Sequence, residues 1–253
     1  FSGAIAQIVG EPAEGDIVGG FAQDGSFLAY GHYQIGSIAV RVLSFSGEDV
    51  FDPGFWVNMI SRAKNVRASV GLTSVDSRTN CYRLVHGEGD GLPGLIIDYY
   101  DGVCVIQAHS VGMFRSKSAI CEALKTVYGD SLKAVYDKSS GTAPFKAGLN
   151  LIDGYLYKAE GFSDDEQIVL ENGNRFLVNW TEGQKTGFFL DQRENRNLVG
   201  RYSRGRNVLN LFCYTGSFSV YAAEGRASRV ESVDLSNTYL TWTKQNMALN
   251  GFT

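Results

Sequence analysis

The sequence predicts a multi-domain α/β protein, and three observations indicate this fold class. Residues 1–52 carry short alternating apolar runs between Gly, Asp and Ser turns, which is typical of a small β-barrel. The middle of the chain alternates strand and helix patterns. Near the end, a buried strand, a turn closing on Gly216, a helix and a second apolar run follow one another. At 253 residues the chain is long enough for two domains, or for three small ones.

The first domain is predicted over residues 1–72, as a barrel followed by a helix. The runs IAQIV, DIVGGFA, SFLAYGHYQ and IAVRVLSF predict its strands. The helix is predicted in PGFWVNMISRAKNVRASVG, because Pro favours the first helical turn. Its apolar face is predicted to consist of Phe55, Met59, Ile60, Ala63 and Val66. The polar stretch Thr73–Asn80 is the predicted boundary to the next domain.

A central α+β domain is predicted over residues 73–163. The run YRLVHGEGDGLPGLIIDYYDGVCVIQAHS predicts three strands, MFRSKSAICEALKTVYG a single amphipathic helix ending at Gly129, and LKAVYDKS a further strand. His86 and Glu88 lie in the glycine-rich turn. An ordinary turn with incidental polar residues is the favoured interpretation there, and an acid–base pair is the alternative.

Residues 164–253 are predicted to hold a linking β-hairpin and the first part of a nucleotide-binding domain. QIVLENGNRFLVNW predicts the hairpin, since Asn-Gly is a strong signal for a two-residue turn. VLNLFCYTGSFSVYAA predicts a strand, a turn and a helix, and VESVD, which ends at Asp234, predicts the next strand. A helix is predicted over Tyr239–Leu249.

The turn between the first of these strands and its helix is the predicted cofactor site. Asp234 lies 18 residues after Gly216, close to the ~20-residue offset at which an acid holds ribose hydroxyls. The turn lacks the three-glycine dinucleotide fingerprint, so S-adenosylmethionine (SAM) suits it better than NAD. An ordinary strand-to-helix turn is the structural alternative. The predicted cofactor-binding residues here are Phe212, Tyr214, Thr215, Gly216 and Asp234.

The segment KTGFFLDQR, Lys185–Arg193, is predicted to close the cofactor pocket. Its apolar Phe188 and Leu190 stand beside the polar Asp191 and Gln192, and a partly buried ligand site requires this combination. The alternative is an aromatic-rich strand end followed by a helix start at Asp191.

A local basic cluster follows the same segment. The net charge of −4 gives no global argument for nucleic-acid binding, so a phosphate-binding surface has to be local. Six side chains are predicted to contact RNA phosphates: Lys185, Arg193, Arg196, Arg201, Arg204 and Arg206. A solvated amphipathic helix is the alternative.

Cysteine and histidine usage argues against metal and disulfide chemistry. The four cysteines and three histidines are dispersed, which predicts buried thiols in a reducing cytoplasm and no metal site. Cys213 lies inside the cofactor turn and is not expected to be a nucleophile. No apolar run approaches the ~20 residues of a membrane span, so a cytoplasmic protein is expected.

With these motifs, the chain resembles the RlmI-like family of 23S ribosomal RNA cytosine-C5 methyltransferases along essentially its whole length. FSGAIAQIVG is similar to the family's opening PUA barrel, RLVHGEGDGLPGLIIDYY to its central domain, and KTGFFLDQRENR with NLFCYTGSFSVYA to its cofactor-binding core. The resemblance implies a PUA-like barrel, a central domain and a Rossmann-like class I methyltransferase domain. It implies SAM as cofactor and ribosomal RNA as partner, and leaves a homodimer open.

The resemblance also marks what this sequence is expected to lack. The family's basic segment would precede Phe1, and its D-P-P-type motif and catalytic cysteine would follow Thr253. That cysteine thiolate attacks carbon 6 of a flipped cytosine before carbon 5 takes the methyl group. Catalytic residues are therefore unassigned, and this chain by itself is expected to lack methyl-transfer activity. An RNA-binding module without catalysis and an NAD-dependent oxidoreductase are the alternative functions.

Overall fold

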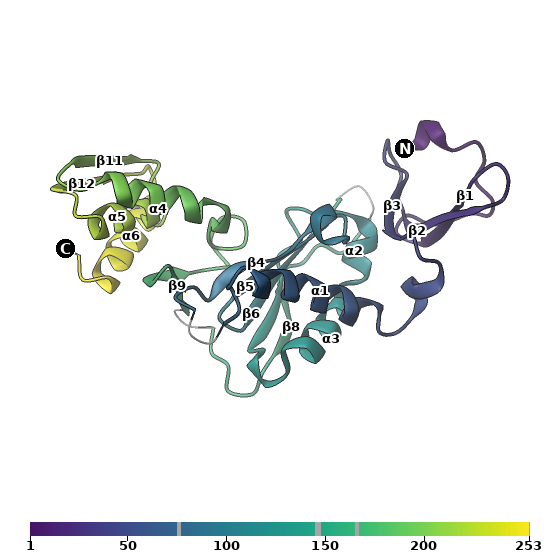
Figure 1. Ribbon diagram of the computed structural model, residues 1–253, viewed down its shortest axis with the longest axis horizontal. Coiled ribbons are helices and arrows are strands. Elements are labelled where there is room, and N and C mark those ends of the chain that lie inside the picture. Colours follow the sequence, from purple (N-terminus) through teal and green to yellow (C-terminus); the bar gives the residue numbers. More distant parts are fainter. Residues whose placement is uncertain (75–76, 145–147, 165–166, 253) are drawn as a thin grey trace. The chain divides into compact units, whose positions relative to one another are not determined.

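The computed structural model describes residues 1–74, 77–144, 148–164 and 167–252. The chain forms two compact units (Figure 1). The N-terminal unit comprises Phe1–Thr73 and Arg83–Phe162, and the C-terminal unit comprises Ser74–Tyr82 and Ser163–Thr253. The predicted boundary Thr73–Asn80 includes Val75 and Asp76, which lie outside the described residues. The predicted boundaries of the three domains stay predictions.

The start of the N-terminal unit is a three-stranded antiparallel sheet. Its strands are β1 (Ile17–Phe21), β2 (Phe27–Tyr33) and β3 (Val40–Ser44), in that order. The run IAQIV was predicted as a further strand, and this was wrong: it forms no strand, and Ile8 and Val9 are 50% and 86% exposed. Within the described residues no strand pairs with it, so its alternation of apolar residues has no sheet to join.

Helix α1 (Phe55–Ser69) follows this sheet and buries Phe55, Met59, Ile60 and Ala63 as predicted. Val66 was expected on the same face but is 56% exposed, because it lines an open hollow of the surface. Short 3-10 helices punctuate this unit at Ser2–Ala4, Glu48–Phe51, Gly87–Asp90 and Gly129–Ser131.

A five-stranded sheet forms the core of the N-terminal unit, in the order β4-β5-β6-β7-β8. The strands are β4 (Cys81–His86), β5 (Leu95–Tyr100), β6 (Val103–Ala108), β7 (Ala134–Asp137) and β8 (Gly154–Lys158). The first four were predicted. The edge strand β8 was missed, because its half-buried GYLYK sequence has no clear apolar alternation. β5 and β6 are antiparallel, whereas β6 and β7 are parallel.

The predicted single helix between β6 and β7 is two helices. They are α2 (Val111–Arg115) and α3 (Lys117–Tyr128), with Ser116 between them. The Ser110 side chain caps α2 by accepting a hydrogen bond from the Met113 N–H. Helix α3 buries Ile120 and Leu124, as the amphipathic pattern predicted.

The C-terminal unit begins with the predicted hairpin, β9 (Gln167–Glu171) and β10 (Asn174–Val178). Its turn residues Asn172 and Gly173 both have positive φ, as a two-residue hairpin turn requires.

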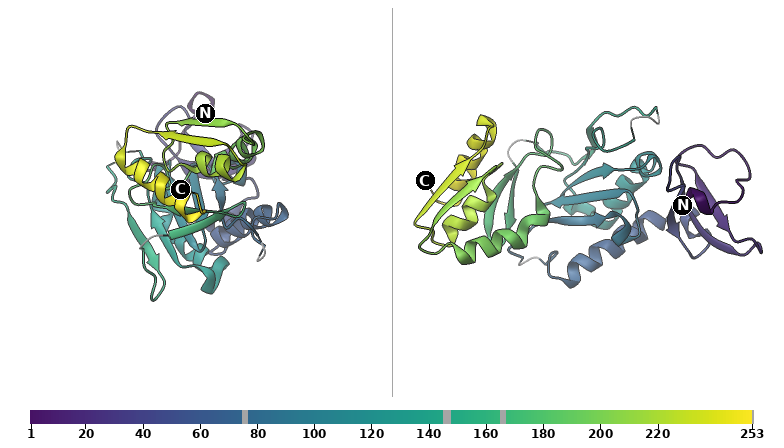
Figure 2. Two further views of the ribbon diagram at one scale, coloured as in Figure 1. Left: turned by 90° about the vertical axis from the view of Figure 1, so that its left-hand side faces the viewer. Right: turned by 90° about the horizontal axis from the view of Figure 1, so that it is seen from above.

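The rest of the unit alternates helix and strand. A 3-10 turn, Leu190–Gln192, leads into α4 (Arg193–Tyr202), which precedes β11 (Asn207–Leu211), α5 (Ser217–Glu224), β12 (Arg229–Val233) and α6 (Asn237–Leu249). Strands β11 and β12 are parallel. Helices α5 and α6 lie along one face of this strand pair (Figures 1 and 2), and on the other face Leu209, Leu211 and Val233 are about half exposed. The site described below lies where the two strands end.

Candidate cofactor-binding site

The turn after β11 and the residue after β12 are bound to each other by hydrogen bonds. The Cys213 N–H donates to the Val233 carbonyl at 3.0 Å. The carboxylate of Asp234 accepts from the Tyr214 N–H at 2.9 Å and from the Ser236 N–H at 3.0 Å. Because a carboxylate has about four acceptor positions, both oxygens can still receive hydroxyl donors from a ligand. The structure therefore brings Asp234 and the turn together, as the spacing predicted.

The backbone of the turn is strained. Phe212 and Tyr214 have φ of 55° and 50°, a region that bulky residues rarely adopt. Such conformations persist when the surrounding structure imposes them, and they gather at functional sites. Lys185, in the segment predicted to close the pocket, also has a positive φ, of 49°.

Gly216 has a packing role that the sequence did not reveal. Its φ is 73°, and a Cβ atom there would lie 2.5 Å from Cγ2 of Thr243 on α6. The sequence analysis placed this glycine among the predicted cofactor-binding residues, and that assignment stays a prediction. In the structure, the absence of a side chain at Gly216 lets Thr243 of α6 pack directly against the turn.

The hydroxyl of Tyr214 connects the turn to the Lys185–Arg193 segment. It accepts a hydrogen bond from the Gln184 N–H at 2.9 Å and lies 3.3 Å from the Gly187 carbonyl, to which it donates. The Phe189 ring meets the Tyr214 ring edge-on at 5.3 Å between centroids. Burial raises the pKa of Tyr214 to about 12, so the hydroxyl keeps its proton at neutral pH. Two segments that were predicted separately thus form one structure.

Thr215 offers a polar group without a partner. The residue is 3% exposed, and its Oγ1 is buried with no hydrogen-bond partner in the described part of the chain. Its side chain lines a cavity of about 260 Å³ together with Trp180, Trp242 and Gln245. Buried hydroxyls are normally bonded, so a ligand or a water that satisfied this one would gain affinity from it.

The remaining predicted cofactor residues fall in two environments. Phe188 and Leu190 are 2% and 8% exposed and belong to the interior. Phe188 packs against Phe176, with 5.1 Å between ring centroids. Asp191 is exposed and accepts a hydrogen bond from the Gln192 side chain at 2.8 Å.

Two apolar side chains stand in solvent at the edge where β11 and β12 end. Phe212, which was predicted, is 84% exposed, and Leu235, which was missed, is 99% exposed. The available signal for Leu235 was an apolar residue directly after the acid in VESVDLS. Such residues offer the apolar surface that a planar base would cover.

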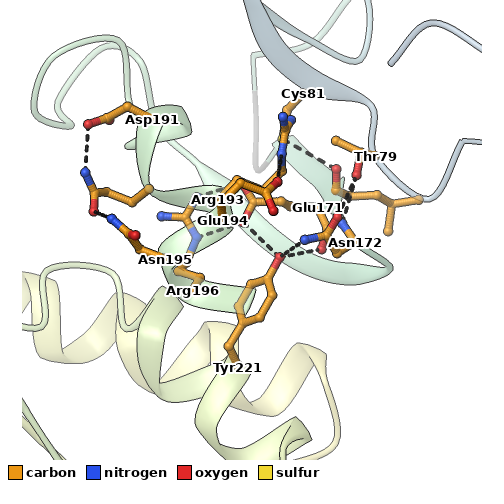
Figure 3. Close-up of polar contacts among 12 residues, drawn as sticks. Thr79, Cys81, Glu171, Asn172, Asp191, Arg193, Glu194, Asn195, Arg196 and Tyr221 are labelled. Atoms are coloured by element: carbon orange, nitrogen blue, oxygen red, sulfur yellow. Dashed lines mark hydrogen bonds and ion pairs between the residues drawn. The ribbon is translucent and has the colours of Figure 1, made fainter. Parts of the chain in front are cut away.

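Arg196 does not belong to a phosphate-contacting surface, and this corrects the predicted basic cluster. Its side chain is completely buried and forms a two-bond ion pair with Glu171, at 2.7 and 2.6 Å (Figure 3). An arginine committed to a buried carboxylate cannot reach a nucleic-acid backbone. The pattern of basic residues along α4 could not distinguish this position from its exposed neighbours.

The other five basic residues lie in two places. Lys185 is exposed, with its Nζ 4.8 Å from the centre of the Phe189 ring, and Arg193 pairs with Glu194 at 3.3 Å. Lys185 directly follows Gln184, whose N–H donates to the hydroxyl of Tyr214 in the cofactor turn. The exposed Arg201, Arg204 and Arg206 lie around the end of α4 and the start of β11.

The second group, Arg201, Arg204 and Arg206, therefore lies at the amino-terminal end of β11, whereas the cofactor turn lies at its carboxyl end. At about 3.3 Å per strand residue, Arg206 is roughly 20 Å from Phe212. The exposed Arg226, which was not predicted, joins this second group, since its carbonyl accepts from the Gly205 N–H at 2.9 Å.

No described residue offers an activated thiol or a metal centre. All four cysteines are free and buried. Cys213 Sγ lies 3.5 Å from Thr243 Oγ1, and burial raises the pKa of this thiol, which disfavours the thiolate needed for attack. Among the described residues, no cluster of three or more His, Cys, Asp or Glu side chains could bind a metal ion. The described helices are also all too short or too polar to cross a membrane.

Comparison with protein families finds two matches. Residues 1–45 match a PUA-like domain, and residues 156–253 match an S-adenosylmethionine-dependent methyltransferase. The second match covers the hairpin, the Lys185–Arg193 segment and the cofactor turn. It agrees with the choice of SAM over NAD that the single glycine of the turn indicated.

Curated relatives match nearly the whole chain. The chain is 40% identical over 254 residues to ribosomal RNA large subunit methyltransferase I of Aeromonas hydrophila, a match that covers 99% of this chain and 62% of the relative. It is 38% identical over 256 residues to the protein of the same name from Shewanella amazonensis, with the same coverage. The chain thus spans about 62% of the length of these relatives.

Two solved structures share the fold. A candidate SAM-dependent methyltransferase from Streptococcus mutans superposes with a TM-score of 0.79 at 25% identity, covering 96% of this chain and 61% of that one. A candidate methyltransferase complexed with SAH gives a TM-score of 0.79 at 26% identity, covering 95% and 60%. The resemblance carried by the motifs is confirmed: the chain is similar to ribosomal RNA large subunit methyltransferase I, with a match to a PUA-like domain at its start and to a SAM-dependent methyltransferase domain at its end.

Proposed function

We propose that this chain binds SAM at the carboxyl ends of β11 and β12 and takes part in the methylation of large-subunit ribosomal RNA. The observation that carries the proposal is the hydrogen bond from the Tyr214 N–H to Asp234, which holds a carboxylate with further acceptor positions beside a strained turn. Ligands of open α/β sheets bind at this edge. The names of the relatives support the reaction and the substrate, and the complex of the similar structure with SAH supports the cofactor.

The residues present fit the parts of SAM. Asp234 would accept the ribose hydroxyls, and the exposed Phe212 and Leu235 would flank the adenine. The unpartnered Thr215 Oγ1 and the N–H groups at the start of α5 would receive the polar end of the methionine moiety. When bound, SAM supplies an electrophilic methyl group, and the chain's own residues bind and orient it. Lys185, Asp191 and Gln192 would border the site from the segment held by Tyr214.

Calorimetric titration of the full chain with SAM, SAH and NAD tests the cofactor. SAM and SAH are expected to bind and NAD is not, since the turn has one glycine and cannot cradle a pyrophosphate in the three-glycine manner. NAD binding without SAM binding would favour the oxidoreductase alternative and refute the proposal.

RNA would be held mainly through its phosphates. Lys185 and Arg193 would contact it beside the cofactor turn, and Arg201, Arg204 and Arg206 at the amino-terminal end of β11, so an RNA touching both groups has to span roughly 20 Å. The PUA-like domain would provide a further RNA-binding surface.

The finer assignment, methylation of carbon 5 of a cytosine, rests on the resemblance to the RlmI-like family. It is tested by incubating ribosomal RNA with labelled SAM and the protein, digesting the RNA and identifying the labelled nucleoside. Labelled 5-methylcytidine would support the assignment, and a different labelled nucleoside would refute it. SAM binding with no label transferred is the outcome that the expected lack of a catalytic cysteine predicts for this chain by itself, and an RNA-binding module without catalysis predicts the same outcome.

A further inference from the structure

The ion pair between Glu171 and Arg196 connects two parts of the C-terminal unit in its interior. Both side chains are 0% exposed. Arg196 Nε donates to Glu171 Oε1 at 2.7 Å, and Nη2 donates to Oε2 at 2.6 Å (Figure 3). Glu171 is the last residue of β9 and Arg196 lies in the first turn of α4. The pair therefore binds the hairpin to the helix that directly follows the Lys185–Gln192 segment.

One further side chain contacts the carboxylate, and a second side chain holds the first in place. The Tyr221 hydroxyl lies 3.0 Å from Glu171 Oε1, and it accepts a hydrogen bond from the Asn172 side chain at 3.0 Å. Figure 3 shows Tyr221 reaching from α5 toward Glu171, and Asn172 approaching from the hairpin turn. The plane of the Arg196 guanidinium is thus set by groups from α5 and from the hairpin.

The guanidinium of Arg196 also lies over the ring of Phe188. The guanidinium carbon lies 4.6 Å from the centre of the Phe188 ring. Phe188 is 2% exposed and belongs to the segment that borders the proposed cofactor site. Besides the ring contacts of Phe188 and Phe189, the segment is held at Gly187 by the Tyr214 hydroxyl and at Phe188 by Arg196. The residue before it, Gln184, donates to the same hydroxyl.

Filling a protein interior with an ion pair carries a large desolvation penalty. Well-packed apolar side chains of similar volume often stabilise a protein equally or better, because they avoid desolvating two charges. Here the desolvation penalty is less fully compensated, because Arg196 Nη1 is buried with no partner in the described part of the chain. What the pair offers over apolar packing is orientation, since the planar fork of arginine matches a carboxylate in one geometry.

Building on the proposed function, we infer that Glu171 and Arg196 are positioning residues for cofactor binding. They hold Phe188, and with it the segment from Lys185 to Gln192, in the arrangement that closes the SAM site. Neither residue touches the cofactor. They affect the affinity for SAM indirectly, by keeping the segment from Lys185 to Gln192 ordered.

The test replaces the pair by apolar residues in the full chain, as the double variant Glu171→Leu, Arg196→Met. This variant leaves no unpaired charge, and the Tyr221 hydroxyl keeps the Glu171 carbonyl at 3.2 Å as a partner. Three quantities are measured: thermal stability, the SAM dissociation constant, and hydrogen exchange of the Phe188–Gln192 amides without ligand. We expect unchanged or higher stability, faster exchange of these amides, and SAM binding weakened by about tenfold, because misplaced contacts lose binding energy. Arg196→Lys, which keeps the charge and loses the fork, should show the same faster exchange.

The matched control is Asn174→Ala. It removes the 2.9 Å contact between the hairpin and Glu224 of α5, without touching Phe188. It should lower stability and leave SAM affinity and the exchange of the Phe188–Gln192 amides unchanged. A folded double variant with full SAM affinity and unchanged exchange would show that the pair has a structural role only. If the wild-type chain bound no SAM while the exchange still rose, the proposed function would fail and the positioning of the segment would stand.

Discussion

Replacing Asp234 by Ala removes a carboxylate that has two separable roles. In the structure it accepts from the Tyr214 N–H at 2.9 Å and from the Ser236 N–H at 3.0 Å, so it shapes the turn. In the proposed complex it also accepts hydrogen bonds from the ribose hydroxyls of SAM. Hydrogen bonds to a charged group contribute about 1.5–3 kcal/mol, so SAM affinity should fall by about tenfold to a hundredfold. The Tyr214 and Ser236 N–H groups are only partly buried and can donate to water instead, which limits the loss of stability to about 1–2 kcal/mol.

The assay has to separate lost ligand contacts from a loosened turn. Ser236→Ala is the matched control, because the Ser236 side chain caps α6 by accepting from the Tyr239 N–H at 3.3 Å. Loss of such a cap costs about 1 kcal/mol, similar to the structural part of the Asp234 change. Calorimetry with SAM and urea unfolding are performed on both variants. Asp234→Ala should lose affinity and stability, and Ser236→Ala only stability. Equal losses of affinity in the two variants, or an unchanged dissociation constant for Asp234→Ala, would refute the ribose-binding role.

Three further outcomes are expected. Changing Arg201, Arg204 and Arg206 to Gln should weaken RNA binding and reduce the slope of log affinity against log salt by about 2–3, and an unchanged slope would show that they form only a solvated surface. Tyr214→Phe removes both bonds to the Lys185 segment, so SAM affinity should fall about tenfold; a wild-type affinity measured by calorimetry would contradict the link. Burial lowers the pKa of His32 from 6.5 to about 4, so the unfolded chain takes up its proton at higher pH than the folded one. Stability of the N-terminal unit should therefore fall by about 3 kcal/mol between pH 6.5 and 4, and urea unfolding of His32→Leu should lack this component.

Several elements were predictable because their signals are local. The Asn172-Gly173 turn has positive φ at both residues, and the sequence pair alone indicates this. The helix from Asn237 to Leu249 begins at a serine cap, and the strand-turn-helix around Gly216 follows from apolar period and one glycine. Each signal concerns neighbours along the chain, whose geometry the backbone itself restricts.

The family resemblance added what local signals cannot supply. The single-glycine turn and Asp234 favoured SAM, and the motifs KTGFFLDQR and GEGDGLPGL indicated a resemblance to the RlmI-like family, which the comparisons confirmed. The nature of the cofactor and the order of the domains therefore follow from the amino-acid sequence by itself. The roles of the individual site residues remain proposals.

The tertiary structure alone decided which side chains of these segments face solvent and which face the interior. Arg196 and Arg201 are both arginines of α4, yet the first is buried against Glu171, a residue 25 positions away, and the second is exposed. Phe188 was expected at a ligand and lies in the interior, and Gly216 makes room for Thr243. The run IAQIV has the alternation of a strand and no partner within the described residues. In each case the outcome depends on whether a residue distant in sequence makes a contact, and neither apolar period nor charge pattern carries information about such a partner until the chain has folded.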